Sequence, residues 1–292
     1  MLIRGVQDLE THVQAREGTP VWVYNEKSVV PFLTSLKDNN GNPLFSKEYI
    51  HEATGALDTN SFQVQDADVK ARAVFPTASL FNNSCKPNCF RVVNRNGISI
   101  ITTELVKKGS ELTICYTGLL TPTHIRQAVF KHTKHFNCSC PRCLDVTEEG
   151  TFPTCLLCSA CGGRLEGNSC ISCNQSQDAQ RIEQISLLCD TLVSRLVQEE
   201  NCEILTGGLM KLRRLVYLHH YLLVKLKLHF IKHSEKCSTC YDGAARAQCS
   251  TEIADLLKIH KIEKTWLKHE EIRGNQETLC SWKSLMAEKK EN

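Results

Sequence analysis

The sequence predicts an α+β protein, in which a region of short strands is followed by two cysteine-rich segments and an all-helical C-terminal region. Between residues 55 and 120, short β-prone runs alternate with Gly, Asn and Pro turns. Between residues 138 and 173, cysteines recur at the spacings of metal ligands. Beyond residue 178, apolar residues recur at the three- and four-residue spacing of core-packed helices.

Composition narrows the possible classes of protein. A chain of 292 residues with 41% hydrophobic content can bury one large core or two modest ones. The net charge of +3 is nearly balanced, which argues against a nucleic-acid or membrane surface. The start of the chain has no apolar signal-peptide region, and no apolar run approaches the ~20 residues of a membrane span. We therefore expect a soluble, intracellular protein.

The N-terminal stretch, residues 1 to about 53, is predicted to be mainly helical. Residues 39–43 form a turn by composition. Two groups of side chains lie at one-face helical spacing: Val6, Leu9, His12 and Val13, and Val29, Val30, Leu33 and Leu36.

From residue 55 to residue 116 the pattern changes to short strands. Residues 90–93 and 98–102 flank an Asn-Gly turn at 94–97, which predicts a β-hairpin. Residues 112–116 predict another strand. A helix over 123–135 then leads to the first cysteine cluster.

That cluster places three thiolates within one short loop, at Cys138, Cys140 and Cys143. Tetrahedral zinc needs a fourth ligand, and Cys85, in a polar turn before Pro87, is the natural donor. Such a site would attach this loop to the middle of the chain. The alternative is three reduced surface cysteines.

A second cluster consists of two C-x-x-C turns, formed by Cys158 and Cys161 and by Cys170 and Cys173. Such turns direct backbone N–H groups at thiolates, and two of them complete a four-cysteine zinc site. A redox role is the alternative, but it lacks the βαβ context of thioredoxin-like motifs. Cys155 is interpreted as a spectator. Seventeen cysteines in a chain without a signal peptide indicate metal ligands rather than disulfides.

The C-terminal region is predicted to be helical throughout. Apolar stripes of this kind are typical of helices packed on a core. One stripe ends at Leu196, a longer one runs continuously from Leu209 to Phe230, and Ile253 to Leu267 suggest one or two further helices. By their spacing, four residues in this region are candidate ligands of a third metal ion: His229, His233, Cys237 and Cys240. The alternative is that these side chains are solvated or packed on a helix.

Three ordered motifs resemble the C-terminal half of a SET domain of the SET-and-MYND (SMYD) type. They read SLFNNSCKPN at 79–88, GSELTICY at 109–116 and FNCSCPRC at 136–143. Residues 59–62 and 143–151 look most like the arthropod-specific branch. The resemblance implies a helical SET insert at 1–54, the C-terminal half of the SET domain at 55–120, a post-SET zinc region at 121–176 and a helical C-terminal domain at 177–292.

The resemblance also implies an activity: transfer of a methyl group from S-adenosylmethionine to a protein lysine. Tyr116 would be the catalytic residue, lining the lysine channel. The residues facing the cofactor would be Asn60, Ser79, Asn82, Asn83 and Phe136. The alternative is a purely structural role, in which the tyrosine packs in the core and the asparagines form turns.

Two departures from the family pattern stand out. Asn83 occupies the position of the family's histidine. The family's upstream glycine-rich cofactor turn and its MYND zinc finger have no counterpart before Cys85, the first cysteine. We therefore expect either a fragment or alternative product of a longer protein, or a protein that has lost that half.

The implied partners are a histone or other protein lysine and, through the helical domain, chromatin regulators, in the nucleus, the cytoplasm or both. No nucleic acid or membrane is expected. A second hypothesis is a zinc-stabilised, non-catalytic scaffold that binds protein partners. A zinc-ribbon nucleic-acid binder is disfavoured because the chain lacks a basic stripe with interleaved aromatics.

Overall fold

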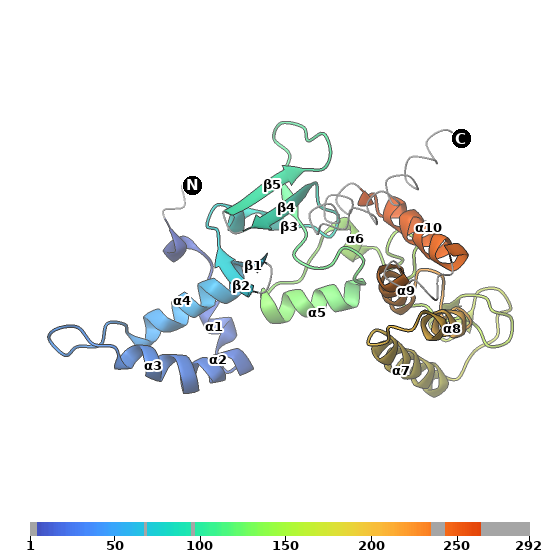
Figure 1. The fold of residues 1–292 in the computed structure, drawn as a ribbon, viewed down its shortest axis with the longest axis horizontal. Coiled ribbons are helices and arrows are strands. Elements are labelled where there is room, and N and C mark those ends of the chain that lie inside the picture. The colour runs from blue at the N-terminus through green and yellow to red at the C-terminus, as the bar shows by residue number, and fades with distance from the viewer. Residues whose placement is uncertain (1–4, 67–68, 95–96, 235–242, 264–292) are drawn as a thin grey trace. The chain divides into compact units, whose positions relative to one another are not determined.

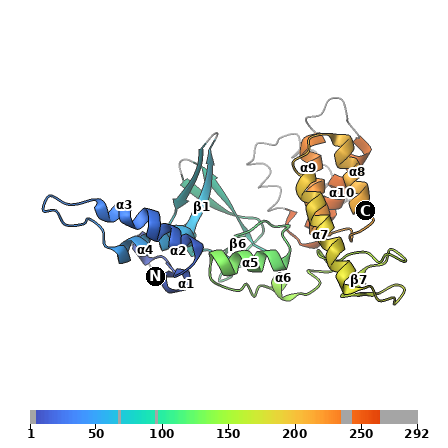
Figure 2. The same cartoon turned by 90° about the horizontal axis from the view of Figure 1, so that it is seen from below.

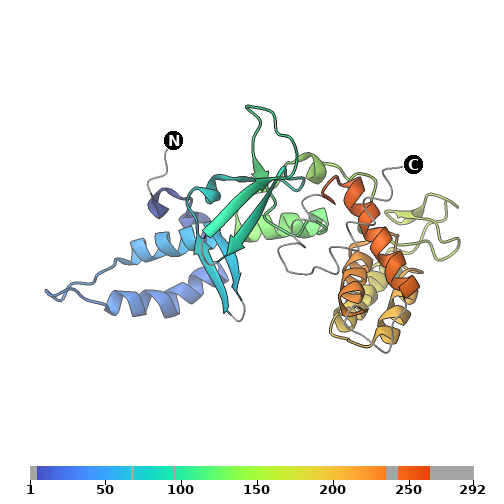
Figure 3. The same ribbon diagram turned by 45° about the horizontal axis from the view of Figure 1, so that its top comes forward.

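The computed structural model describes residues 5–66, 69–94, 97–234 and 243–263, and Figures 1, 2 and 3 present them from three directions. The chain divides into two compact units. The first contains Met1–Ile114 and Gln127–Cys138, and the second contains Cys115–Arg126 and Ser139–Asn292. The predicted α+β class is confirmed.

The N-terminal part of the first unit is helical, as predicted. Its elements are a 3-10 turn η1 (Val6–Asp8), α1 (Val13–Arg16), α2 (Pro20–Tyr24), a π-helical turn η2 (Asn25–Val29), α3 (Val30–Ser35) and α4 (Lys47–Asn60). The Ser46 hydroxyl accepts the N–H of Tyr49 at 3.2 Å, and this cap sets the start of α4.

Helix α4 packs closely against the segment that contains α1. Arg16 is 3% exposed, donates to the carbonyl of His51 and pairs with Asp58 on α4. Gly55 lies directly beneath the carbonyl of Thr11, because a Cβ at this position would come within 2.3 Å of that oxygen. The small residue in α4 therefore permits the close approach of the two backbones.

The strands of the first unit form two hairpins and one short parallel pair. The hairpins are β1 (Ser61–Asp66) with β2 (Val69–Val74), and β4 (Cys89–Asn94) with β5 (Gly97–Thr102). The parallel pair joins β3 (Asn82–Asn83) to β6 (Thr113–Ile114). The hairpin predicted at 90–102 is confirmed.

Two strand predictions need correction. Residues 55–60 are helical, because Gly55 and Ala56 lie on the buried face that extends α4 to Asn60. The strand predicted over 112–116 contains only Thr113 and Ile114, because its partner β3 is itself only two residues long. The Asn88 side chain accepts the N–H of Thr113 at 2.8 Å.

The second unit contains the remaining helices and a small hairpin. Its elements are α5 (Thr123–Thr133, shared with the first unit), α6 (Pro141–Leu144), β7 (Leu165–Glu166), β8 (Ser169–Cys170), α7 (Ala179–Leu196), α8 (Cys202–Leu212), α9 (Tyr221–Ser234) and α10 (Gly243–Ile259). Helix α9 packs against α7, α8 and α10, as Figure 2 also shows. Leu205, Leu223 and Phe230 are fully buried in the resulting core.

The continuous helical stripe predicted over 209–230 is wrong, because α8 ends at Leu212 and α9 begins at Tyr221. The intervening segment pairs with the cysteine-rich region instead. Val216 forms a β-bridge with Leu156, and the N–H of Leu157 donates to the carbonyl of Leu215 at 2.9 Å. Val216 keeps the apolar spacing between the two helices because it is buried, but it is buried against Leu156 and not on the face of a helix. Among the described helices, none is both long and apolar enough to cross a membrane.

Candidate cofactor and metal sites

The first two motifs are joined by side-chain amides as well as by the parallel strand pair. Asn82 donates to the carboxylate of Glu111 at 2.6 Å. Asn88 donates to the Glu111 carbonyl at 2.8 Å and accepts the N–H of Thr113 at 2.8 Å. Each amide therefore ties residues 79–88 to residues 109–116, so the two motifs form one local structure.

Asn60 and Ser79, both predicted to face the cofactor, contact each other. The Ser79 hydroxyl donates to the carbonyl of Asn60 at 3.2 Å and to that of Phe75 at 3.1 Å. The Asn60 amide donates to the carbonyls of Ala56 at 2.9 Å and Glu10 at 2.8 Å. Asn60 therefore anchors the end of α4 with its amide N–H groups.

Phe136 lies three residues beyond the end of α5 and stacks on Phe130, with ring centroids 5.1 Å apart. Two residues earlier, the Lys134 ammonium donates to the carbonyl of Thr59. Burial lowers the pKa of Lys134, and Arg72 and Arg91 lower it further. The contact between Lys134 and Thr59 brings the Phe136 segment next to the Asn60 segment.

All five residues predicted to face the cofactor therefore lie in the first unit, on segments linked by direct contacts. Their contacts with a cofactor stay predictions. Tyr116 lies two residues beyond the end of β6, in the second unit, and is half-buried. Its catalytic role likewise stays a prediction.

The first cysteine cluster forms as the spacing predicted. The Sγ atoms of Cys85, Cys138, Cys140 and Cys143 all lie within 4.8 Å of one another. Cys85 is fully buried and Cys138 is 6% exposed, with their sulfurs 4.0 Å apart. Four thiolates at this separation fit a tetrahedral zinc ion, and Cys85 is the fourth member.

Two neighbouring residues of α5 support this cluster. Gln127 clamps the backbone of Cys138, since its side chain donates to the Cys138 carbonyl at 2.7 Å and accepts the Cys138 N–H at 2.9 Å. Arg126 donates to the sulfur of Cys143 at 3.3 Å. Thus the helix that precedes the motif also orients its cysteines.

The second cluster consists of Cys158, Cys161, Cys170 and Cys173, whose Sγ atoms also lie within 4.8 Å of one another. The closest pairs are Cys161 with Cys170 at 3.4 Å and Cys158 with Cys173 at 3.8 Å. The β7–β8 hairpin carries Cys170, and Gly167 at its turn has a φ of 60°, which favours glycine. This donor set also fits zinc.

Backbone N–H groups point at the thiolates of this second cluster, as expected for such turns. Ala160, Gly163 and Ser172 each donate to a cysteine sulfur at 3.4 Å. The backbone N–H of Cys173 contributes most to lowering the pKa of Cys170 to about 6. These donors favour the deprotonated thiolates that a metal requires.

The alternative third metal site lies partly outside the described residues, which do not include Cys237 and Cys240. Of its histidines, His229 contacts the carbonyl of Glu199 at 2.9 Å, and the His229 and His233 rings are 4.3 Å apart. That site stays a hypothesis.

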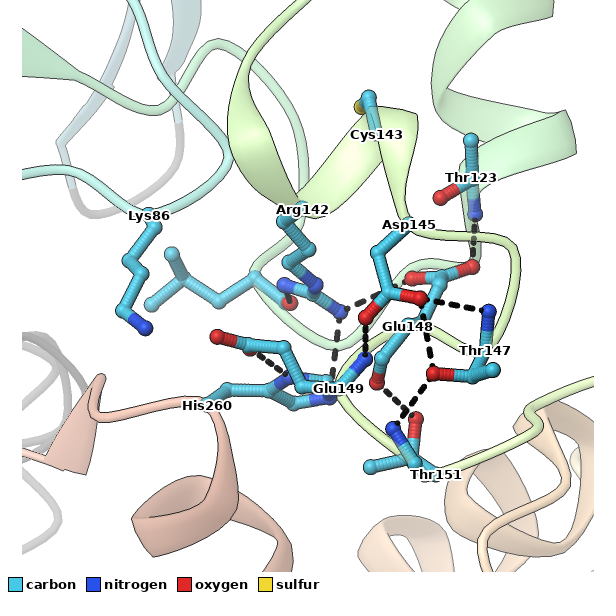
Figure 4. A network of polar contacts seen from close by, with 12 residues as sticks. Lys86, Thr123, Arg142, Cys143, Asp145, Thr147, Glu148, Glu149, Thr151 and His260 are labelled. Carbon is cyan, nitrogen blue, oxygen red and sulfur yellow. Dashed lines mark hydrogen bonds and ion pairs between the residues drawn. The ribbon is translucent and has the colours of Figure 1, made fainter.

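The sequence analysis missed a buried charge network in the second unit, centred on Glu148 (Figure 4). The Glu148 carboxylate pairs with Arg126 at 2.9 Å and with Arg142 at 3.5 Å, and all three side chains are at most 5% exposed. It also accepts the backbone N–H of Thr123, which begins α5, at 2.6 Å. Because Arg126 also reaches Cys143, Glu148 indirectly supports a metal ligand.

The loop that carries Glu148 is tightly structured. Asp145 accepts hydrogen bonds from the N–H groups of Glu149 at 2.6 Å and Thr147 at 2.9 Å, and these bonds, that from Glu149 most, lower its pKa. Glu148 and Glu149 adopt left-handed backbone conformations, with φ of 47° and 62°. Their surroundings therefore hold them in a conformation that is unfavourable for side-chain-bearing residues.

His260, which follows α10, extends the network. Its Nδ1 lies 2.7 Å from Glu149 and its Nε2 lies 3.4 Å from Arg142, which also donates to the carbonyl of Leu119 at 2.6 Å. Burial, with Arg142 adding to it, lowers the pKa of His260 to about 4, so the ring is neutral near pH 7. A neutral ring with its proton on Nδ1 satisfies both contacts.

Comparisons with known proteins match these features. Residues 9–117 match the SET domain family. The chain is 38% identical over 122 residues to the SET domain-containing protein SmydA-8, isoform B, of Drosophila melanogaster, an alignment covering 40% of this chain and 27% of that protein. It is 33% identical over 96 residues to human histone-lysine N-methyltransferase SMYD3, covering 32% of this chain and 22% of that protein.

A third relative is the protein-lysine N-methyltransferase SMYD4 of Pongo abelii, with 28% identity over 147 residues, 49% of this chain and 17% of that protein. Residues 9–117 therefore resemble a SET domain, and the similar proteins include SET-and-MYND methyltransferases, in agreement with the resemblance of the three motifs. It spans about a quarter or less of the length of these relatives. The boundaries predicted at residues 54, 120 and 176 stay predictions.

Proposed function

We propose that this chain forms part of an S-adenosylmethionine-dependent protein-lysine N-methyltransferase. The observation that carries the proposal is the SET-domain match, which contains Asn60, Ser79, Asn82, Asn83 and Tyr116. Two of the relatives are named lysine methyltransferases. The linked positions of the Asn60, Ser79 and Phe136 segments support a shared cofactor site.

S-adenosylmethionine would supply a methyl group activated by a sulfonium. In this proposal the Phe136 ring would pack on the adenine, and the backbone of Asn82 and Asn83 would contact its polar edge. Asn60 and Ser79 would face the remainder of the cofactor. The Phe130 ring, stacked on Phe136, holds that ring in place before the cofactor binds. Hydrogen bonds donated by their side-chain amides hold Asn60 and Asn82 in place in the same way. Such preorganisation reduces the entropic cost of binding.

The Tyr116 phenol would orient the substrate amine. The bound cofactor would supply the methyl carbon to the neutral lysine nitrogen, so that an N–C bond would form as the S–C bond breaks and the proton on nitrogen would pass to solvent. The amine must approach in line with the breaking bond, so catalysis consists mainly of orientation and of a polar environment for the shifting positive charge.

We expect Tyr116→Phe to lower the rate of methyl transfer by at least about a hundredfold, while cofactor binding changes little. The rate is measured as transfer of labelled methyl to histones and to a lysine-peptide pool, and the affinity as equilibrium binding of labelled cofactor. Tyr217→Phe is the matched control, because that ring packs edge-on against Phe152. Undiminished transfer by Tyr116→Phe would contradict the assignment.

A second candidate function is a non-catalytic scaffold. The replacement of the family histidine by Asn83 favours it. In that case the packed helices α7–α10 would bind protein partners, such as chromatin regulators, without methyl transfer. Absence of both cofactor binding and transfer in the metal-loaded protein would favour the scaffold.

We also propose that the protein acts in the nucleus, the cytoplasm or both, in transcriptional regulation. The relative named a histone-lysine N-methyltransferase supports this setting. Imaging of the tagged protein in its own cells, together with transcript profiling after its depletion, tests both parts. Exclusively extracellular protein, or unchanged transcripts, would count against them.

A further inference from the structure

Asn83, the residue that departs from the family pattern, contacts the first metal site directly. Its side-chain amide donates to the sulfur of Cys138 at 3.3 Å and lies 4.0 Å from that of Cys85. Both sulfurs belong to the four-cysteine cluster and both cysteines are buried. An amide N–H pointing at a buried thiolate stabilises its negative charge.

The backbone of the same residue belongs to the strand pair that joins the first two motifs. Asn83 lies opposite Ile114 in the β3–β6 pair, and the next N–H, that of Ser84, donates to the Ile114 carbonyl at 3.0 Å. Ile114 is only 1% exposed. Asn83 therefore connects the cysteine sulfurs, through its own side chain and backbone, to the strand that leads into Tyr116.

The charge of the site explains why such a donor matters. Four thiolates around one Zn²⁺ carry a net charge of about −2, which is costly to bury without hydrogen-bond donors. Groups that support metal ligands in this way typically account for about 10–100-fold in metal affinity. Gln127 donates to the backbone carbonyl of Cys138, whereas Asn83 donates to its sulfur.

We propose that Asn83 is a positioning residue, which strengthens metal binding at the Cys85–Cys138–Cys140–Cys143 site and thereby fixes the β3 backbone for the cofactor. The cofactor part of this inference rests on the proposed function, whereas the metal part does not. The Asn83 amide then compensates for the loss of the family histidine, because it anchors β3 to the sulfur of Cys138.

The second metal site offers a matched control. Gln177 donates its side-chain amide to the sulfur of Cys158 at 3.6 Å, so it relates to the second site as Asn83 relates to the first. Each amide can be removed by an apolar substitution of similar size. Asn83→Leu and Gln177→Leu therefore test one site each within the same protein.

The test uses the full chain loaded with ¹¹³Cd²⁺, a soft ion suited to thiolate sites. Cadmium NMR is expected to give one resonance for each cysteine site. Under competition with a chelator, Asn83→Leu should weaken the first site about tenfold and shift its resonance, leaving the second unchanged. Asn83→Asp, of equal size but carrying a carboxylate, should weaken it further, and Asn83→His should restore part of the loss.

An unchanged second resonance shows that the second unit of the variant protein is folded, and an unchanged circular dichroism spectrum checks the first unit. First-site affinity that is unaffected by both Asn83→Leu and Asn83→Asp would overturn the metal part. The cofactor part is tested at saturating metal. Asn83→Asp should then bind S-adenosylmethionine at least about threefold more weakly than the wild type. The reason is that the new carboxylate and the Cys138 thiolate repel each other, which displaces β3. Equal binding would overturn that part, whereas absence of binding by the wild-type protein would overturn the proposed function instead.

Discussion

Replacing Cys170 with serine is expected to lower the metal content from two ions per chain to about one and to destabilise the helical unit strongly. Cys170 is 2% exposed and belongs to the same apolar core as Leu165, Val216 and Leu223. Binding of a structural zinc ion can contribute on the order of 10 kcal/mol to folding. The loss of one thiolate would leave three ligands, too few to complete the four-coordinate site.

Metal analysis by mass spectrometry under native conditions and thermal unfolding followed by circular dichroism check this expectation. Cys155→Ser is the matched control. Cys155 lies three residues before the first knuckle, and burial raises the pKa of its thiol, so it stays protonated. Two metal ions should remain in Cys155→Ser. Two ions retained in Cys170→Ser would contradict the assignment of the second site.

Glu148→Gln is expected to lower the free energy of unfolding by about 3–5 kcal/mol, because it leaves two buried guanidinium groups without their shared carboxylate. Arg126 is fully buried and Arg142 is 3% exposed, so water cannot replace the lost partner. Urea unfolding followed by circular dichroism provides the measurement.

Glu149→Gln serves as the control in the same loop. Glu149 accepts from His260, whose ring is neutral, and a glutamine oxygen can still accept that bond. A cost of about 1 kcal/mol or less is therefore expected. Comparable destabilisation by the two variants would show that the Glu148 network is not a buried charge centre.

The cysteine sites were predictable from sequence because their chemistry is local. Three of the four ligands of the first site, and two pairs of the second, lie within a few residues of each other, which fixes their geometry within one loop. Cys85 could be named as the distant ligand because it lies in a polar turn before Pro87. The Asn-Gly hairpin at 94–97 was predictable for the same reason, since its turn chemistry is local.

The features that the sequence did not reveal depend on partners far along the chain. Nothing in the spacing of Val216 distinguishes a helix from a β-bridge to Leu156. The partners of Glu148 are 22 and 6 residues earlier, and charged residues in a loop ordinarily predict a solvated surface. The run 143–151 was singled out only for its resemblance, whereas its structural role is to bury a carboxylate.

The structure also changes the meaning of Asn83. From the sequence alone, an asparagine at the histidine position has two interpretations: it substitutes if the residue acts through its backbone groups, and it weakens binding if the histidine ring is the anchor. The Asn83 side chain instead donates to the sulfur of Cys138. The departure from the family pattern is therefore compatible with an intact link between the cofactor segment and the first metal site.

The most direct test of the proposed function is equilibrium binding of labelled S-adenosylmethionine to the zinc-loaded 292-residue chain. We expect saturable binding of one molecule per chain, which Phe136→Ala weakens about tenfold or more by removing the ring that packs on the adenine. No saturable binding at millimolar cofactor, with both metal sites filled, would contradict the account and favour the scaffold.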